Sequence, residues 1–186
     1  MGINLAEAEI RLLDLNEIIE RIYDFKLLLQ DAVERGASVG FLPPVTESQA
    51  EAYWGHVVYD LLETTRVVLG AIVNDRVVGT VQLVPEMRPS GRHRADVQKL
   101  MVLNDYRRKG LGAALMQGVE EAARARNLTL LLLDVRAGDP AERVFARQGY
   151  TRAGIIPGFA RSGDGSLEAA GIYYKGLDSV DSSGAG

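Results

Sequence analysis

Apolar residues recur at helical spacing in four stretches of the chain. Within each stretch they fall three or four residues apart, which would bury one face of a helix. The stretches cover residues 16–35, 46–62, 111–127 and 140–148. Thr46 followed by Gln49 matches a capping box, and Gly36 stands where a helix commonly ends. The pattern therefore predicts four helices.

Short stretches rich in valine, leucine and isoleucine separate these helices and are typical of β-strands. They cover residues 9–15, 66–73, 77–85, 95–103, 128–135, 150–156 and 167–174. Residues 74–76 are expected to close a hairpin. Residues 128–135 are almost wholly apolar, which indicates a central strand covered on both faces. The order of elements predicts a single mixed α/β sheet with a strand–loop–helix unit at its centre.

Composition and length indicate one soluble domain. The chain has 186 residues, of which 47% are hydrophobic and 25% charged. We expect residues 1–177 to form the domain and the small, polar residues 178–186 to be a disordered tail. The N-terminus lacks the pattern of a signal peptide, and no apolar run is long enough to span a bilayer. A cytoplasmic location is the expectation.

The charged and metal-ligating residues exclude several functions. The chain has no cysteine and two histidines, so neither a thiolate site nor a histidine-rich metal site is expected. His93 lies between two arginines, which disfavour its charged form, and is interpreted as a surface residue. The net charge of -4 argues against nucleic-acid binding. Neither a nucleic acid nor a membrane is expected as a partner.

One basic cluster stands out against this acidic background, because it runs into two glycines where a helix begins. A Walker-type loop is absent, and a dinucleotide fingerprint would need a third glycine where Leu115 stands. The remaining pattern, Arg-x-x-Gly-x-Gly, is filled by Arg107, Gly110 and Gly112. Glycine permits close approach of the backbone, and free N–H groups at a helix start attract anions. The pattern favours a phosphate site, with a solvated basic turn as the alternative.

These motifs, taken in order, resemble the GCN5-related N-acetyltransferase (GNAT) superfamily. The glycine loop follows a strand and opens a helix, an apolar strand comes next, and Gly149-Tyr150 follows a further helix. The resemblance covers residues 9–175. A finer resemblance, to the branch that includes the tabtoxin-resistance acetyltransferase, is carried by residues 36–41, 97–103, 150–152, 157–158 and 172–175.

The resemblance implies an α/β GNAT fold, in which two central strands splay apart to form a cleft for acetyl-CoA. In this family the pantetheine arm pairs with the backbone of the strand before the glycine loop, and the diphosphate sits on the loop. The cofactor-binding residues implied in this way are Leu100, Met101, Val102, Leu103, Arg107, Arg108, Lys109, Gly110, Leu111, Gly112, Ala113, Asp139 and Phe145.

The reaction implied is direct attack of a neutral amine on the thioester carbonyl. A base must take the proton of the amine, and Asp134, at the end of the apolar run, is the first candidate. Asp96 is the second candidate. A backbone N–H near Met101 or Val102 would stabilise the oxyanion. The alternative is that each carboxylate caps a strand or pairs with an arginine such as Arg136.

Two positions depart from the family pattern. Many members have a tyrosine that protonates the leaving thiolate, where this chain has Phe145, which donates no proton. Water, Tyr150 or Tyr173 could replace it, or the protein could be slow or inactive. Asp139 stands where relatives often have an asparagine that touches the pantetheine. A CoA-binding sensor without catalysis is therefore the alternative to an enzyme.

The acceptor end is the least specified part of the resemblance. Phe41 and Trp54 are expected to line the acceptor pocket, although a core position is the alternative for Trp54 and is preferred for its neighbour Tyr53. The predicted function is acetyl-CoA-dependent N-acetylation of a small molecule, either an amino-acid-like compound or an antibiotic or toxin. A homodimer is possible, as in many relatives.

Overall fold

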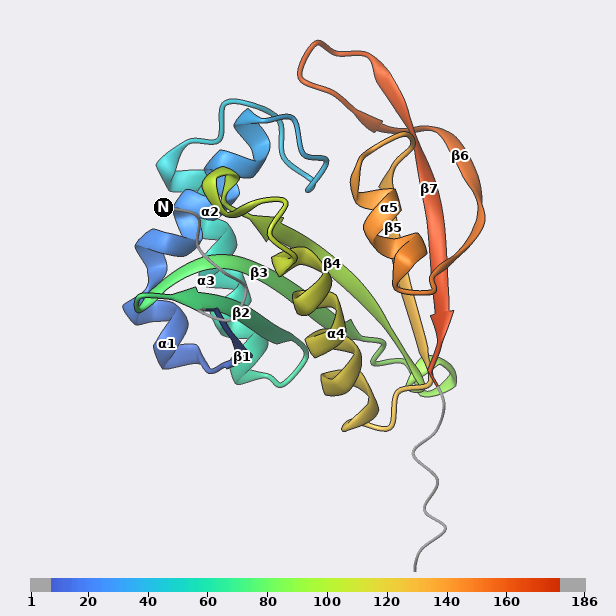
Figure 1. Ribbon diagram of the computed structural model, residues 1–186, viewed down its shortest axis with the longest axis horizontal. Coiled ribbons are helices and arrows are strands. Elements are labelled where there is room, and N and C mark those ends of the chain that lie inside the picture. Colours follow the sequence, from blue (N-terminus) through green and yellow to red (C-terminus); the bar gives the residue numbers. More distant parts are fainter. Residues whose placement is uncertain (1–7, 178–186) are drawn as a thin grey trace, which may run out of the picture.

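A computed structural model describes residues 8–177, and these form one seven-stranded sheet flanked by helices (Figure 1). The strand order is β1-β2-β3-β4-β5-β7-β6, and all neighbours are antiparallel except β4 and β5. The predicted mixed α/β sheet is therefore confirmed. The strands are β1 (Glu9–Leu13), β2 (Val67–Val73), β3 (Arg76–Pro85), β4 (Arg94–Val102), β5 (Leu130–Arg136), β6 (Thr151–Arg161) and β7 (Leu167–Gly176). The tail expected at residues 178–186 lies outside the described residues.

The helices follow the predicted stretches with one exception. They are α1 (Leu15–Glu20), α2 (Ile22–Glu34), α3 (Glu47–Leu62), α4 (Leu111–Arg124) and α5 (Ala141–Arg147). The expected capping box of Thr46 and Gln49 begins α3. The single helix predicted over 16–35 was wrong, because Arg21 leaves the helical conformation and forms an ion pair with Asp75 at 2.6 Å. The apolar spacing continues across this break, so periodicity alone did not show it.

Helices cover both faces of the sheet and define two layers of core. Helix α4 packs Leu115, Met116 and Val119 against one face. Helices α2 and α3 pack Phe25 and Trp54, among others, against the opposite face (Figure 1). None of the helices within residues 8–177 is long and apolar enough to cross a membrane. Strands β2 and β3 are therefore buried on both faces, whereas β5, expected to be covered on both faces, is buried only at alternate positions.

Strands β4 and β5 pair over only three residues and then separate. Their parallel register joins Arg94–Asp96 to residues 130–132, and no further pair follows. Strand β4 also carries a bulge, since its register with β3 shifts near Lys99, whose φ is 53°. An extra residue in one strand bends that strand and turns its side chains. The divergence leaves one edge of β4 unpaired from Val97 onward.

Strand β6 forms the edge of the sheet beyond β7 and is longer than predicted. It extends to Arg161, whereas the sequence indicated an end at residue 156. Pro157 and Gly158 break the strand pattern, and the structure accommodates them with a register irregularity between Ile156 and Ala160. The hairpin of β6 and β7 reaches toward the segment between α2 and α3 (Figure 1).

Candidate functional site

A cavity of about 310 Å³ lies where β4 and β5 diverge, and a second cavity, of about 380 Å³, shares the loop between α2 and α3 with it. The smaller, called here the cleft cavity, lies between the strands. Its walls are residues 37–40 of the loop, 97–100 of β4, 133–135 of β5, and Asp139, Ala141 and Phe145 beside or in α5. The larger, called the adjoining cavity, lies between the loop and the hairpin of β6 and β7. Both have the size of small-molecule pockets.

The glycine loop presents six consecutive backbone N–H groups, residues 108–113, that donate to no other described residue. The first hydrogen bond of the helix ladder runs from the N–H of Ala114 to the carbonyl of Gly110, at 3.0 Å. Arg108 and Gly110 have positive φ angles of 58° and 87°. A Cβ at Gly112 would meet no atom within 4 Å. These N–H groups and the positive end of the α4 dipole can therefore receive an anion.

The three basic side chains of the loop differ in their contacts. Arg107 turns back into the protein, where its Nε donates to the carbonyl of Val102 at 2.8 Å and its guanidinium lies 3.7 Å from Asp31. Lys109 donates to the carbonyl of Asp105 at 2.7 Å. Arg108 has no ion pair or hydrogen bond to another described residue. Arg107 fixes the loop to the end of β4, and Arg108 is the cation that remains for a ligand.

Residues 100–103, predicted to pair with the pantetheine arm, lie at the open edge of β4 or just beyond its end. Met101 and Val102 are in register with β3, and the N–H of Leu103 donates to the carbonyl of Val78 at 2.9 Å. Met101 is buried, whereas Leu100 lines the cleft cavity. The strand is thus held from the β3 side, and its opposite edge faces the cleft.

The two candidate acids lie near each other but in different hollows. Asp134 is exposed and lines the cleft cavity. Asp96 lies in a shallower hollow of about 220 Å³ with Glu86 and Arg94, which form an ion pair at 3.0 Å. Asp96 is exposed at the rim of this hollow, yet partial desolvation and the charges of Asp134 and Glu86 raise its pKa against the opposing charge of Arg94. Asp134 is therefore the acid that lines the cleft cavity. Asp96 lies close enough for the negative charge of Asp134 to raise its pKa.

Phe145 is buried and closes the cleft cavity from α5. Tyr150 and Tyr173 pack behind it, with ring centroids 6.0 Å and 6.2 Å from its own, and neither lines the cleft cavity. Burial raises the pKa of both phenols. Asp139 also lines the cavity, and its carboxylate accepts from the N–H of Ala141 at 2.8 Å. No tyrosine hydroxyl therefore takes the place of the one that Phe145 lacks in this wall.

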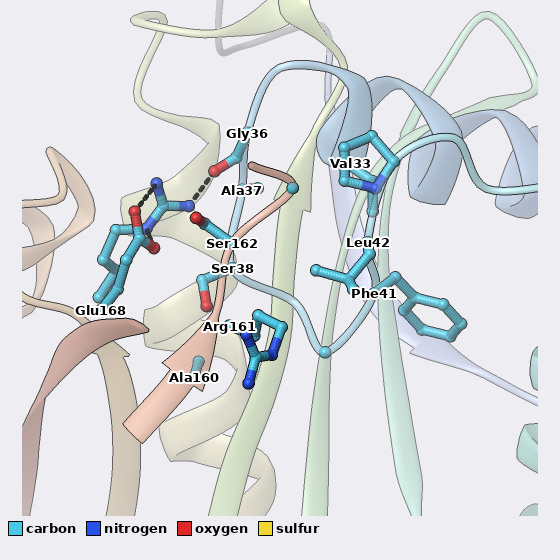
Figure 2. Close-up of a pocket in the computed structure, with 14 residues that line it drawn as sticks. Val33, Gly36, Ala37, Ser38, Phe41, Leu42, Ala160, Arg161, Ser162 and Glu168 are labelled. Carbon is cyan, nitrogen blue, oxygen red and sulfur yellow. Dashed lines mark hydrogen bonds and ion pairs between the residues drawn. The ribbon is translucent and has the colours of Figure 1, made fainter. Parts of the chain in front are cut away.

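The structure separates the two aromatic residues expected at the acceptor end. Phe41 is one of the residues that line the adjoining cavity. Figure 2 shows this cavity with Leu42 of the loop and Arg161 and Ser162 of the hairpin among its other lining residues. Trp54 has no exposed surface and packs 4.6 Å from Phe25 in the core beneath α2 and α3. Direct contact of Trp54 with an acceptor is thus corrected to a packing role, because the helix turns its indole toward the sheet.

Several residues that line the cavities were not among the predicted ones, and Ser38 and Lys99 are two of them. Ser38 lines both cavities, and Lys99 lines the cleft cavity at the bulge of β4. The signal for Lys99 was the sequence Gln98-Lys99, which places two polar side chains in succession where a regular strand would alternate. Such an interruption indicates a bulge, and bulges commonly redirect a side chain next to a site.

The sequence model of the Acetyltransferase (GNAT) family matches residues 27–150, and the chain therefore belongs to this family. Members of the family transfer an acetyl group from acetyl-CoA to an amine. The chain is also 31% identical, over 117 residues, to an uncharacterized N-acetyltransferase in the hisH-hisA intergenic region of Azospirillum brasilense. That match covers 62% of this chain and 68% of the relative.

Solved structures share the fold at low sequence identity. The ribosomal-protein-alanine N-acetyltransferase of Brucella melitensis is 20% identical, with a TM-score of 0.76 over 91% of this chain and 99% of that one. The protein yncA of Salmonella typhimurium, solved with its cofactor acetyl-CoA, is 16% identical, with a TM-score of 0.75 over 96% and 99% of the two chains. These similarities establish the arrangement of the sheet and helices.

Proposed function

We propose that this protein transfers an acetyl group from acetyl-CoA to the amine of a small molecule by direct attack on the thioester. The observation that carries the proposal is the run of free N–H groups at residues 108–113, next to the open edge of β4. The diphosphate of acetyl-CoA can accept hydrogen bonds from these N–H groups. The amide chain of its pantetheine can pair with the open edge of β4. The membership of the family supports the same reaction.

The residues present fit acetyl-CoA in three respects. The glycine loop offers backbone donors and the side chain of Arg108 to a diphosphate. The free edge of β4 offers main-chain groups to an amide chain, in the manner of an added strand. The space beside Gly112 is open to a bulky ligand. Residues 100–103 and 108–113 would hold the bound molecule, while Arg107 holds the loop in place.

Bound acetyl-CoA supplies the activated acetyl group, so the protein must provide an uncharged amine and a path for its proton. An alkyl amine with a pKa of about 10.4 is mostly protonated at neutral pH. Asp134 lines the cleft and has no ion pair with another described residue, which suits a carboxylate that receives this proton directly or through water. The N–C bond forms as the C–S bond breaks, and CoA leaves as the thiol with a proton from solvent.

The acceptor is proposed to be small, either an amino-acid-like compound or an antibiotic or toxin. The cleft cavity of about 310 Å³ and the adjoining cavity of about 380 Å³ share Ala37, Ser38 and Gly40, and together they leave room for a small molecule whose amine lies in the cleft. Resistance to a toxin of the tabtoxin type would follow from acetylation of its amine. The finer sequence resemblance of residues 36–41 and 97–103 supports this choice of acceptor.

The test is release of CoA thiol from acetyl-CoA in the presence of amino acids, dipeptides, polyamines, aminoglycosides and tabtoxinine-β-lactam. Binding of acetyl-CoA is measured in parallel by calorimetry. We expect turnover with one class of amine and loss of turnover in Asp134→Asn. Binding of acetyl-CoA without turnover on any amine would favour a CoA sensor, which the presence of Phe145 makes a defined alternative. Absence of binding would refute both functions.

A further inference from the structure

The ammonium group of Lys99 occupies an unusual place for a charged group. Lys99 lies at the bulge of β4, with its side chain directed toward α3, where Nζ stands 5.6 Å from the centre of the Tyr53 ring. A Cβ on Gly40 would lie 3.6 Å from the same Nζ, so the α2–α3 loop also lies close to it. Within residues 8–177 it forms neither an ion pair nor a hydrogen bond.

Neighbouring cations are already satisfied, which distinguishes Lys99 from them. Arg66 forms an ion pair with Asp60 at 2.8 Å and donates to Gln82 at 2.5 Å. Arg136, in the adjoining cavity, forms an ion pair with Glu168 at 2.8 Å (Figure 2). Arg161 donates to the carbonyl of Gly165 at 2.8 Å.

Lys99 is half-buried, and among the described residues its ammonium group is compensated by the face of the Tyr53 ring and not by a carboxylate. This compensation is weaker than an ion pair in the free protein. Burial and the nearby charge of Arg66 lower the pKa of Lys99, and Asp134 opposes that shift. An anion bound against Nζ would relieve the burial penalty. Asp134 stands in the same cavity. The cleft cavity therefore carries one ammonium group, that of Lys99, and two carboxylates. Of these, Asp139 accepts from the N–H of Ala141 beside α5, whereas the side chain of Asp134 has no hydrogen bond or ion pair to another described residue.

We propose that Lys99 binds a carboxylate of the acceptor, so that the acceptor is an amino-acid-type molecule whose amine lies toward Asp134. This inference rests on the proposed acetyl transfer and specifies the substrate class of the same cleft. A cationic amine and a carboxylate on one molecule match the signs of Asp134 and Lys99. Polyamines and aminoglycosides, which lack an anionic group, place a cation against Lys99 and are excluded as good acceptors.

The test compares amino acids with their carboxamides as acceptors, in pairs that differ in the separation of amine and carboxylate. The wild type is set against Lys99→Met, the conservative variant Lys99→Arg, and Arg161→Met. Lys26→Met is the matched control, because Lys26 pairs with Glu47 on α2 and α3 and lines neither cavity. A carboxamide also changes the basicity of the amine. For each protein, kcat/KM with the carboxylate is divided by kcat/KM with the carboxamide. This ratio is then compared with the ratio for Lys99→Met, because the difference in basicity is the same for both proteins and cancels.

We expect the wild-type ratio to exceed that of Lys99→Met by roughly ten- to a hundredfold, the size of a hydrogen bond between charged groups. The change should appear in KM, with partial rescue in Lys99→Arg and none of the loss in Lys26→Met. Equal ratios in the wild type and Lys99→Met would overturn the inference and leave acetyl transfer intact. If Arg161→Met, and not Lys99→Met, lost the preference for the carboxylate over the carboxamide, Arg161 would be the anion-binding residue and the inference would be overturned as well.

If no amine is acetylated, the proposed function fails, and the inference is then decided by binding. Calorimetry of the same pairs in the presence of CoA gives the carboxylate-to-carboxamide affinity ratio. A preference for the carboxylate that disappears in Lys99→Met would support the anion site. The same affinity for both members of every pair would overturn it.

Discussion

Replacement of Gly112 by leucine tests the phosphate site without harming the fold. Gly112 is the second residue of α4, and a Cβ there would meet no protein atom within 4 Å. Leucine is a better helix former than glycine by up to about 1 kcal/mol. For a protein of this size that gain raises Tm by roughly 2–4 °C. The variant should therefore be folded and at least as stable as the wild type.

We expect the same side chain to hinder the approach of a diphosphate, because Gly112 is itself one of the residues 108–113 whose N–H groups donate to no other described residue. Loss of one charge-assisted hydrogen bond to a diphosphate costs about 1.5–3 kcal/mol. At about 1.4 kcal/mol for each factor of ten, Kd for acetyl-CoA should rise roughly 10- to 150-fold. The affinity is measured by isothermal calorimetry, and Tm by differential scanning calorimetry on the same samples.

Gly118 provides the matched control in the same helix. A Cβ there would lie 2.8 Å from Cδ2 of Leu69 and 3.2 Å from Cγ2 of Ile10, so that face is packed against the sheet. Leucine at this position overpacks the core, which costs about 1–3 kcal/mol. Gly118→Leu should lower Tm and leave the Kd of the folded protein unchanged. An unchanged Kd in Gly112→Leu would refute the phosphate site, and a large loss of stability there would refute the open surface.

Two further substitutions test the cleft, and a third tests Asp96 in the neighbouring hollow. Asp134→Asn should lower kcat by roughly 10²- to 10⁴-fold with little change in the Kd of acetyl-CoA, and wild-type rates across pH would exclude this carboxylate as the base. Phe145→Tyr restores a phenol to the cleft wall and should raise kcat about tenfold or more if thiolate protonation limits turnover; the same kcat with intact cofactor binding would contradict that role. Partial desolvation and the charges of Asp134 and Glu86 raise the pKa of Asp96, so its ionised form lowers stability at neutral pH, by an amount that solvent at this exposed residue keeps small. The Tm of Asp96→Asn at pH 7 should therefore equal or exceed that of the wild type. The difference in Tm should disappear in acid, below the usual pKa range of aspartate, where Asp96 is protonated in both the folded and the unfolded protein. A Tm at pH 7 below that of the wild type would contradict the raised pKa.

Most of the fold was predictable because local signals and burial agree along much of the chain. The β2–β3 hairpin followed from two valine-rich runs, and its turn residues Asn74 and Asp75 adopt the positive φ angles that such turns need. Helix α3 followed from its capping box. The break at Arg21 was not predictable, since it depends on an ion pair with Asp75, more than fifty residues away.

The candidate site was predictable where backbone chemistry determines it and less so where tertiary packing does. The glycine loop was recognisable because the φ angle of 87° at Gly110 favours glycine. The positive φ angle of Arg108 had no such signal in the sequence. The inward turn of Arg107 was not recognisable, because it requires the carbonyl of Val102 and the carboxylate of Asp31 to be in place. A basic sequence run thus specified a phosphate site, but not which of its cations would be available to the phosphate.

Residues at the acceptor end were the hardest to predict from the sequence, because they too are positioned by tertiary packing. Lys99 is placed by a bulge in β4, by the ring of Tyr53 on α3 and by the α2–α3 loop at Gly40, which are three elements distant in the chain. No local sequence pattern indicates that these three elements lie together in the fold. The backbone features that bind a shared cosubstrate are written in short motifs, whereas side chains that select an acceptor depend on packing between elements. The substrate of such a protein is therefore better sought from the unpaired charges of its cleft than from its motifs.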